Sequence, residues 1–173
     1  MKNNWRSVPS LRLTALVCLV VCGFAASAFA GPRTIYLVRH AERGATTGPS
    51  ATDTHLSATG RARAERLAAA LKDAKITGIY TTEYKRTQET AAPLVHSLGI
   101  QPEVISAGET SRLVARLKVS RGNVLVVGHS NTLPLIINLL GVSSPVTIAE
   151  SEFDNLFVVV LDPTPHLIHR QYR

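Results

Sequence analysis

The chain has 173 residues, a formal net charge of +7 and two cysteines, Cys18 and Cys22. This is the length of one domain. The chain has few aromatic residues and no Lys/Arg run, so it gives little support for nucleic-acid binding. Residues 31–173 keep 16 Lys and Arg against 12 Asp and Glu, a net charge of 16 − 12 = +4, because three basic residues lie in the first thirty. A mild positive field of this kind suits a small anionic substrate.

The first thirty residues have the pattern of a secretory signal peptide. Three basic residues precede an apolar run from Leu13 to Ala26, and the segment ends in Ala28-Phe29-Ala30. The apolar run is shorter than the roughly 20 residues of a spanning helix, although a retained membrane anchor stays the alternative. We expect cleavage after Ala30, secretion to the periplasm, and no stable membrane insertion afterwards. Both cysteines lie in this leader, so the domain over residues 31–173 is expected to contain no disulfide.

The domain begins with a buried strand. Residues 34–38 form a near-continuous run of β-branched and apolar side chains, which is typical of a strand covered on both faces. The polar segment from Arg43 to His55 has no periodicity and is expected to be a loop over the substrate pocket. Apolar residues at helical spacing then predict a helix over residues 57–74, with Ser57 as its N-cap.

A short strand over residues 78–81 and a helix over residues 85–98 follow. Gly99 is the expected end of this helix, and Pro93 is awkward within it and is expected to kink or interrupt it.

The rest of the chain continues the alternation of strands and helices. Strands are expected at 103–105, 124–128 and 156–161, helices at 111–119 and 132–140, and residues 167–171 are expected to pair beside the last strand. Such alternation predicts a three-layer α/β fold, with a mainly parallel central sheet and helices on both faces, in a single compact domain.

Polar side chains follow three of these strands at their carboxyl ends. They are Arg39-His40-Ala41-Glu42, the segment Thr81–Thr87 and Gly128-His129-Ser130-Asn131. Ligands of parallel α/β sheets bind at this edge, so two histidines and two arginines are expected to converge there.

This set of side chains suits phosphoryl transfer. Arginine binds a phosphate dianion through paired hydrogen bonds that lysine reproduces poorly. One imidazole can attack phosphorus and form a phosphohistidine, while a second one stabilises the developing charge on the phosphoryl oxygens. This chemistry needs no metal or other cofactor, and no pair of His or Cys residues has the spacing of metal ligands.

These motifs resemble those of a known family. Arg39-His40-x-Glu42 is similar to the RHG/RHA signature of the histidine phosphatase (phosphoglycerate mutase-like) superfamily. Leu56-Ser57-x-x-Gly60, TTEYKRTQET (Thr81–Thr90) and VVGHSNT (Val126–Thr132) match the superfamily in the same order. The resemblance covers essentially all of residues 31–173. The short length and the lack of a cap insertion make the chain similar to the minimal branch, which includes the phosphohistidine phosphatase type.

The resemblance implies a role for each matched residue. His40 would be the nucleophile, Arg39 and Arg86 would bind the phosphate, and His129 would be the second imidazole of the pocket. Asn131 would contribute to substrate binding, and Glu42 would have a supporting role.

The function implied is that of an exported, metal-independent phosphatase. It would hydrolyse small phosphate monoesters, or other phosphoryl compounds, through a phosphohistidine on His40. Two alternatives stay open: a phosphomutase, and a non-catalytic phosphate- or phosphosugar-binding module on the same fold.

The proton donor to the leaving group is the least defined residue. In the mutase-like branch a Glu after the third strand has this role, and Glu109 lies in about the matching place. In the phytase-like branch an Asp follows the second histidine, but Ser130 stands there in this chain. Glu83 is a second candidate, and a site without any dedicated acid is the third possibility.

Overall fold

The structure is a computed structural model that describes residues 33–45 and 53–173, together with Met1. The predicted signal peptide and the middle of the polar segment 43–55 therefore lie outside the described residues. Within the described part of the chain, no helix combines the length and the apolarity that a membrane span requires.

A six-stranded sheet with the order β3-β2-β4-β1-β5-β6 forms the centre of the described domain. Its first four strands are parallel neighbours, whereas β5 runs antiparallel to β1 and β6 antiparallel to β5. The predicted mainly parallel sheet is thus confirmed, with the C-terminal hairpin as its antiparallel part. The strands are β1 (Thr34–Arg39), β2 (Ile76–Thr81), β3 (Glu103–Val104), β4 (Asn123–Gly128), β5 (Asn155–Val160) and β6 (His166–Gln171).

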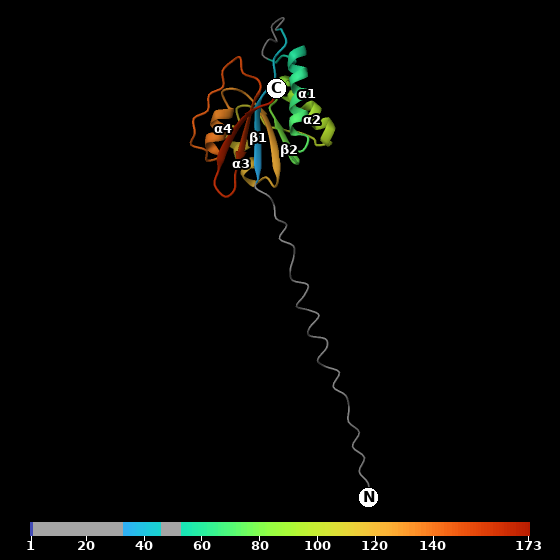
Figure 1. The fold of residues 1–173 in the computed structure, drawn as a ribbon, viewed down its shortest axis with the longest axis vertical. Coiled ribbons are helices and arrows are strands. Elements are labelled where there is room, and N and C mark those ends of the chain that lie inside the picture. Colours follow the sequence, from blue (N-terminus) through green and yellow to red (C-terminus); the bar gives the residue numbers. More distant parts are fainter. Residues whose placement is uncertain (2–32, 46–52) are drawn as a thin grey trace. The chain divides into compact units, whose positions relative to one another are not determined.

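Helices cover both faces of the sheet, as predicted. Figure 1 shows α1 and α2 on one side of the strands and α3 and α4 on the other. The side chains of β4 alternate between the two layers: Val124 and Val126 pack toward α3 and α4, and Leu125 and Val127 toward α1 and α2. A strand that is buried on both faces needs the continuous apolar run seen in the sequence. The helices are α1 (Ala58–Leu71), α2 (Lys85–Leu98), α3 (Thr110–Val119) and α4 (Leu133–Leu139).

From the sequence, Pro93 was expected either to kink or to interrupt the helix. Helix α2 is continuous through Pro93, so the helix is not interrupted. Proline removes one backbone donor from the helix. Buried side chains on both sides of it, including Thr90, Ala91 and Leu94, nevertheless hold the helix in the core. Burial of the apolar face therefore outweighs the local cost of the proline.

Gly60 explains the Leu56-Ser57-x-x-Gly60 motif. The first turn of α1 lies against the segment that follows β1, and the Ser57 N–H donates to the carbonyl oxygen of Glu42 at 2.9 Å. Ser57 caps the helix by accepting from the Gly60 N–H at 3.0 Å. A Cβ on residue 60 would lie 2.2 Å from the Glu42 oxygen, so only glycine allows this approach.

Replacing Gly60 with alanine is therefore expected to lower the free energy of unfolding by about 1–3 kcal/mol, because the added methyl group forces the two backbones apart. Urea denaturation followed by circular dichroism measures this change. Gly108→Ala is the matched control, since its added Cβ meets no atom within 4 Å. Equal loss of stability in the two variants would contradict the proposed steric cause.

Candidate active site

Two histidines meet at the carboxyl edge of the sheet. β1 and β4 are parallel neighbours with Arg39 opposite Gly128, so His40 and His129 leave the sheet side by side. The His40 N–H donates to the carbonyl oxygen of Gly128 at 3.0 Å, which continues the ladder by one bond. The two imidazole centroids are 5.5 Å apart, and the residues are only 5% and 8% exposed.

A cavity of about 410 Å³ opens above these two rings, and we call it the histidine cavity. Five of the residues proposed from the sequence line it, namely Arg39, His40, Arg86, His129 and Asn131. The other residues that line it are Arg43, Tyr84, Ala107, Gly108, Ser130, Thr132 and Glu150.

The tautomer of His40 follows from one hydrogen bond. Its Nδ1 lies 2.8 Å from the carbonyl oxygen of Ala41. A carbonyl can only accept, so Nδ1 carries the proton and Nε2 keeps its lone pair for the cavity. The Ala41 N–H in turn donates to Thr90 Oγ1 at 2.9 Å, which ties this segment to α2.

Burial also keeps His40 uncharged. It lowers the pKa of His40 to about 4; the hydrogen bond to Ala41 opposes this shift, and the positive charges of Arg86 and Arg39 reinforce it. At neutral pH the imidazole is therefore neutral, the form in which Nε2 is a nucleophile.

His129 is oriented by a threonine. Its Nε2 lies 3.1 Å from Thr82 Oγ1, and that hydroxyl lies 3.0 Å from Thr87 Oγ1. The ring also meets the Tyr84 ring edge-on, with centroids 5.4 Å apart. Burial, followed by the charge of Arg86, lowers the pKa of His129 to about 4. A neutral imidazole held in this way can donate one hydrogen bond to a bound phosphoryl oxygen.

Arg39 is buried against the segment 149–153. Its Nη1 donates to the carbonyl oxygens of Ala149, Glu150 and Glu152 at 3.0, 2.9 and 3.2 Å. Its Nη2 donates to the Glu150 carboxylate at 2.8 Å, and the guanidinium lies 4.3 Å from the centroid of the Phe153 ring. Among the described residues, Nε of Arg39 is buried without a hydrogen-bond partner. This nitrogen is a donor that a bound anion could use.

Arg86 and Arg43 add positive charge to the same cavity. The guanidinium of Arg86 lies 4.1 Å from the centroid of the Tyr84 ring, which holds it in a cation–π contact. Burial, and then the neighbouring charge of Arg43, lower the pKa of Arg86 from its usual value. An arginine nevertheless stays protonated at neutral pH, so these side chains supply permanent positive charge.

The carboxylates proposed from the sequence are engaged elsewhere. Glu109 is exposed and pairs with Arg112 at 3.2 Å, one turn further along α3. Glu83 accepts from the Ala107 N–H at 2.9 Å, and Glu42 binds Arg63 at 2.6 Å. None of these three glutamates lines the histidine cavity.

Glu150 is the carboxylate that sequence reasoning missed. Among the described residues it is the one acidic side chain that lines the histidine cavity. It comes from a stretch without motif or periodicity, so the sequence carries no signal for it. Tyr84 was missed as well, although it lies inside the quoted TTEYKRTQET segment.

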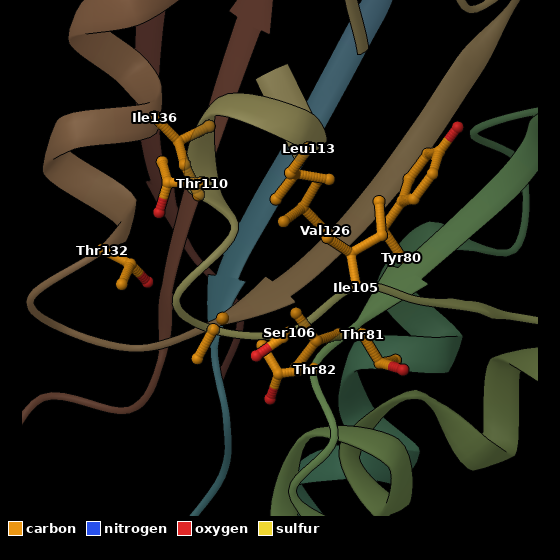
Figure 2. Close-up of a pocket in the computed structure, with 13 residues that line it drawn as sticks. Tyr80, Thr81, Thr82, Ile105, Ser106, Thr110, Leu113, Val126, Thr132 and Ile136 are labelled. Carbon is orange, nitrogen blue, oxygen red and sulfur yellow. The ribbon is translucent and has the colours of Figure 1, made fainter. Parts of the chain in front are cut away.

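A second, much smaller cavity of about 20 Å³ adjoins the histidine cavity. Figure 2 shows Tyr80, Val126, Leu113 and Ile136 around it, one each from β2, β4, α3 and α4. Its volume is enough for about one water molecule. A volume of this size leaves no room for the organic group of a substrate.

The comparisons with known proteins agree with this geometry. A family model of the histidine phosphatase superfamily (branch 1) matches residues 35–107. That range contains Arg39, His40 and Arg86, and the fold places His129 beside them. The matched residues are thus similar to the histidine phosphatase superfamily, the family that the sequence motifs resemble. No curated protein matches it in sequence.

Solved structures share the fold. The glucosyl-3-phosphoglycerate phosphatase of mycobacteria, in complex with inorganic phosphate, has a TM-score of 0.62 at 16% identity, over 81% of this chain and 96% of that one. The alpha-ribazole phosphatase of Shigella flexneri has a TM-score of 0.60 at 18% identity, over 80% and 95%. A protein of Agrobacterium tumefaciens assigned as the phosphohistidine phosphatase SixA has a TM-score of 0.58 at 23% identity, over 78% and 95%.

The low pKa values of the two histidines give a testable expectation. In the ligand-free protein, the NMR signals of His40 and His129 are expected to titrate with midpoints near pH 4, because burial disfavours the imidazolium. Both rings then stay neutral as the pH falls from 7 to 5. The spectra of His40→Ala and His129→Ala assign the signals. A midpoint near 6.5 for either ring would show that it is solvated, against the structure.

Proposed function

We propose that the protein is an exported, metal-independent phosphatase that hydrolyses small phosphate monoesters through a phosphohistidine on His40. One observation carries this proposal. His40 is a buried neutral imidazole, its tautomer leaves Nε2 unprotonated, and it lies in a cavity lined by arginines. This is what an attack on the phosphorus of an anionic substrate requires.

Five residues of the cavity have a part in the proposed mechanism. Nε2 of His40 attacks phosphorus, and the Nε2–P bond forms as the bond from phosphorus to the leaving oxygen breaks. Arg39 and Arg86 bind the phosphoryl oxygens, with the unpartnered Nε–H of Arg39 as one of the donors. His129 donates to a phosphoryl oxygen as negative charge develops there. Water then attacks phosphorus and releases His40. Asn131, at the exposed rim, is proposed to contact the rest of the substrate.

The two alternatives explain less. A binding module would need the arginines, but it would have no use for a histidine held in its nucleophilic tautomer. A mutase must retain and reorient its intermediate in a closed pocket, whereas the described residues leave the histidine cavity open to solvent. Water has access to the phosphohistidine, which favours hydrolysis.

The substrate class is proposed from the cavity and the neighbours together. About 410 Å³ is enough for a phosphoryl group and part of a small organic group. The structural neighbours include phosphatases named for alpha-ribazole and glucosyl-3-phosphoglycerate. We therefore propose a small phosphorylated metabolite or saccharide as the substrate.

Hydrolysis of p-nitrophenyl phosphate tests the proposed function. The protein is expected to hydrolyse it equally well with and without EDTA, because imidazole and guanidinium groups perform the proposed chemistry. His40→Ala is expected to lower kcat by a factor of at least about 10³, since it removes the nucleophile. His96→Ala is the matched control, because His96 is exposed on α2 and does not line the cavity.

Two outcomes would contradict this proposal. Activity that EDTA abolishes and Zn²⁺ or Mg²⁺ restores would show a metal-dependent mechanism. A folded protein that binds phosphate but has no activity would support the binding module.

Export is proposed from the leader alone. On expression in a Gram-negative host, the protein is expected to accumulate in the periplasmic fraction with Gly31 as its first residue, because the Ala28-Phe29-Ala30 exit is a cleavage signal. Mass spectrometry of the intact protein measures this N-terminus. A full-length chain recovered with the membranes would favour the retained anchor instead.

A further inference from the structure

Glu150 is a cavity residue to which the proposed mechanism assigns no role. Its Oε2 accepts from Arg39 Nη2 at 2.8 Å, and its Oε1 accepts from the Ser130 hydroxyl at 3.2 Å. The carboxylate therefore connects Arg39, at the end of β1, with Ser130, which follows His129 after β4. Its backbone carbonyl also accepts from Arg39 Nη1 at 2.9 Å, so the position of residue 150 is fixed from two sides.

The direction of the leaving group follows from the shape of the cavity. His40 and His129 form a buried floor, and the adjoining void of about 20 Å³ has no room for a leaving group. The phosphoryl group must lie between this floor and the mouth, and in-line attack by His40 places the leaving oxygen on the side away from His40. That oxygen therefore points to the mouth. The side chain of Glu150 stands at the mouth, 83% exposed.

Other carboxylates near this edge of the sheet are held away. Glu109 pairs with Arg112, and Glu83 is bound to the backbone of Ala107. Neither carboxylate reaches the cavity without giving up these contacts. Within the described residues, Glu150 is the acidic group already in place.

We infer that Glu150 is the general acid that protonates the leaving oxygen, and the base that then activates water, in the phosphatase reaction proposed for His40. The inference rests on that proposed function. It gives this chain a proton donor from the segment between α4 and β5 instead of from Glu109 after β3.

The proton can be followed through one cycle. A phosphate monoester that binds as the monoanion passes its proton to the Glu150 carboxylate. Nε2 of His40 bonds to phosphorus, the P–O bond to the leaving group breaks, and the proton moves from Glu150 to the leaving oxygen, which departs as an alcohol. Water then bonds to phosphorus, the Nε2–P bond breaks, and one water proton goes to Glu150. The released phosphate takes this proton away as its monoanion, so the enzyme returns to its starting state.

The ion pair with Arg39 makes this role depend on the substrate. In the free protein the charge and hydrogen bond of Arg39 lower the pKa of Glu150, so the carboxylate is ionised and can accept a proton. An arriving phosphate competes for the same Nη2 and brings negative charge close to the carboxylate. Both changes raise the pKa of Glu150 in the complex, which favours the acid form when it is needed.

A series of leaving groups tests the inference. Values of kcat and KM are measured for the protein and for Glu150→Gln with p-nitrophenyl phosphate, phenyl phosphate and glycerol phosphate. Glutamine keeps the size and the hydrogen-bond acceptor but cannot donate an acidic proton. We expect kcat to fall about 10²- to 10⁴-fold for glycerol phosphate. The loss for p-nitrophenyl phosphate should be less than about tenfold, because its leaving group departs without a proton. Glu103→Gln is the matched control, since Glu103 pairs with Arg116 away from the cavity.

The other outcomes would overturn the inference. An equal loss for all three substrates, seen as a higher KM, would make Glu150 a positioning residue for Arg39. A lower KM with unchanged kcat would mean that Glu150 only competes with phosphate. If Glu109→Gln, and not Glu150→Gln, lowers kcat more for glycerol phosphate than for p-nitrophenyl phosphate, the general acid is Glu109. If the unmodified protein hydrolyses only the aryl esters, it has no general acid. A protein inactive even on p-nitrophenyl phosphate would instead reject the proposed phosphatase function.

Discussion

The parallel register of β1 against β4 is the constraint on which the site depends. Because Arg39 stands opposite Gly128, the residues that follow leave neighbouring strands at the same height, about 4.8 Å apart. The chain then turns to α1 on one face and to α4 on the other, which leaves a crevice between the two strand ends. A slip of one residue would turn Arg39 to the opposite face of the sheet and separate the two imidazoles. The continuous apolar runs of β1 and β4, packed between two helical layers, prevent such a slip.

The wall of the cavity is built around the buried guanidinium of Arg39. A buried charge is tolerated only when acceptors surround it. The segment 149–152 supplies three carbonyl oxygens and one carboxylate, although Glu150 lies 111 positions away from Arg39 in the sequence. This arrangement orders a stretch that has no regular secondary structure. It also leaves the Nε of Arg39 without a hydrogen-bond partner in the described protein, so the contacts that stabilise the wall leave one donor for the proposed phosphate.

The sheet and the positions of the two histidines could be predicted from the sequence because both depend on local patterns. Buried parallel strands produce apolar runs, and the residues that follow such runs lie at one edge whatever the connecting helices contain. The direction of a glutamate side chain has no such signal. Glu109 stands before α3, but it pairs with Arg112 and does not line the cavity. Glu150 enters the cavity because of its contacts with Arg39 and Ser130, which only the folded chain creates. The expected interruption at Pro93 was wrong for a related reason. The packing of α2 in the core outweighed the local effect of proline on the helix.

The depth of the cavity floor reconciles two requirements that conflict in solution. A phosphate-binding site needs positive charge, whereas a nucleophilic histidine must be unprotonated. An exposed imidazole near its usual pKa is only partly protonated at pH 6–7, so it would meet neither requirement fully. Burial lowers the pKa of His40 and of His129 to about 4, and the arginines keep their charge under the same conditions. The positive charge is thereby assigned to groups that cannot act as nucleophiles, and the nucleophile is left neutral. A shallower floor would move the pKa of His40 back toward 6.5 and remove part of the reactive form. Burial of these two rings is thus a condition of the proposed chemistry as well as of packing.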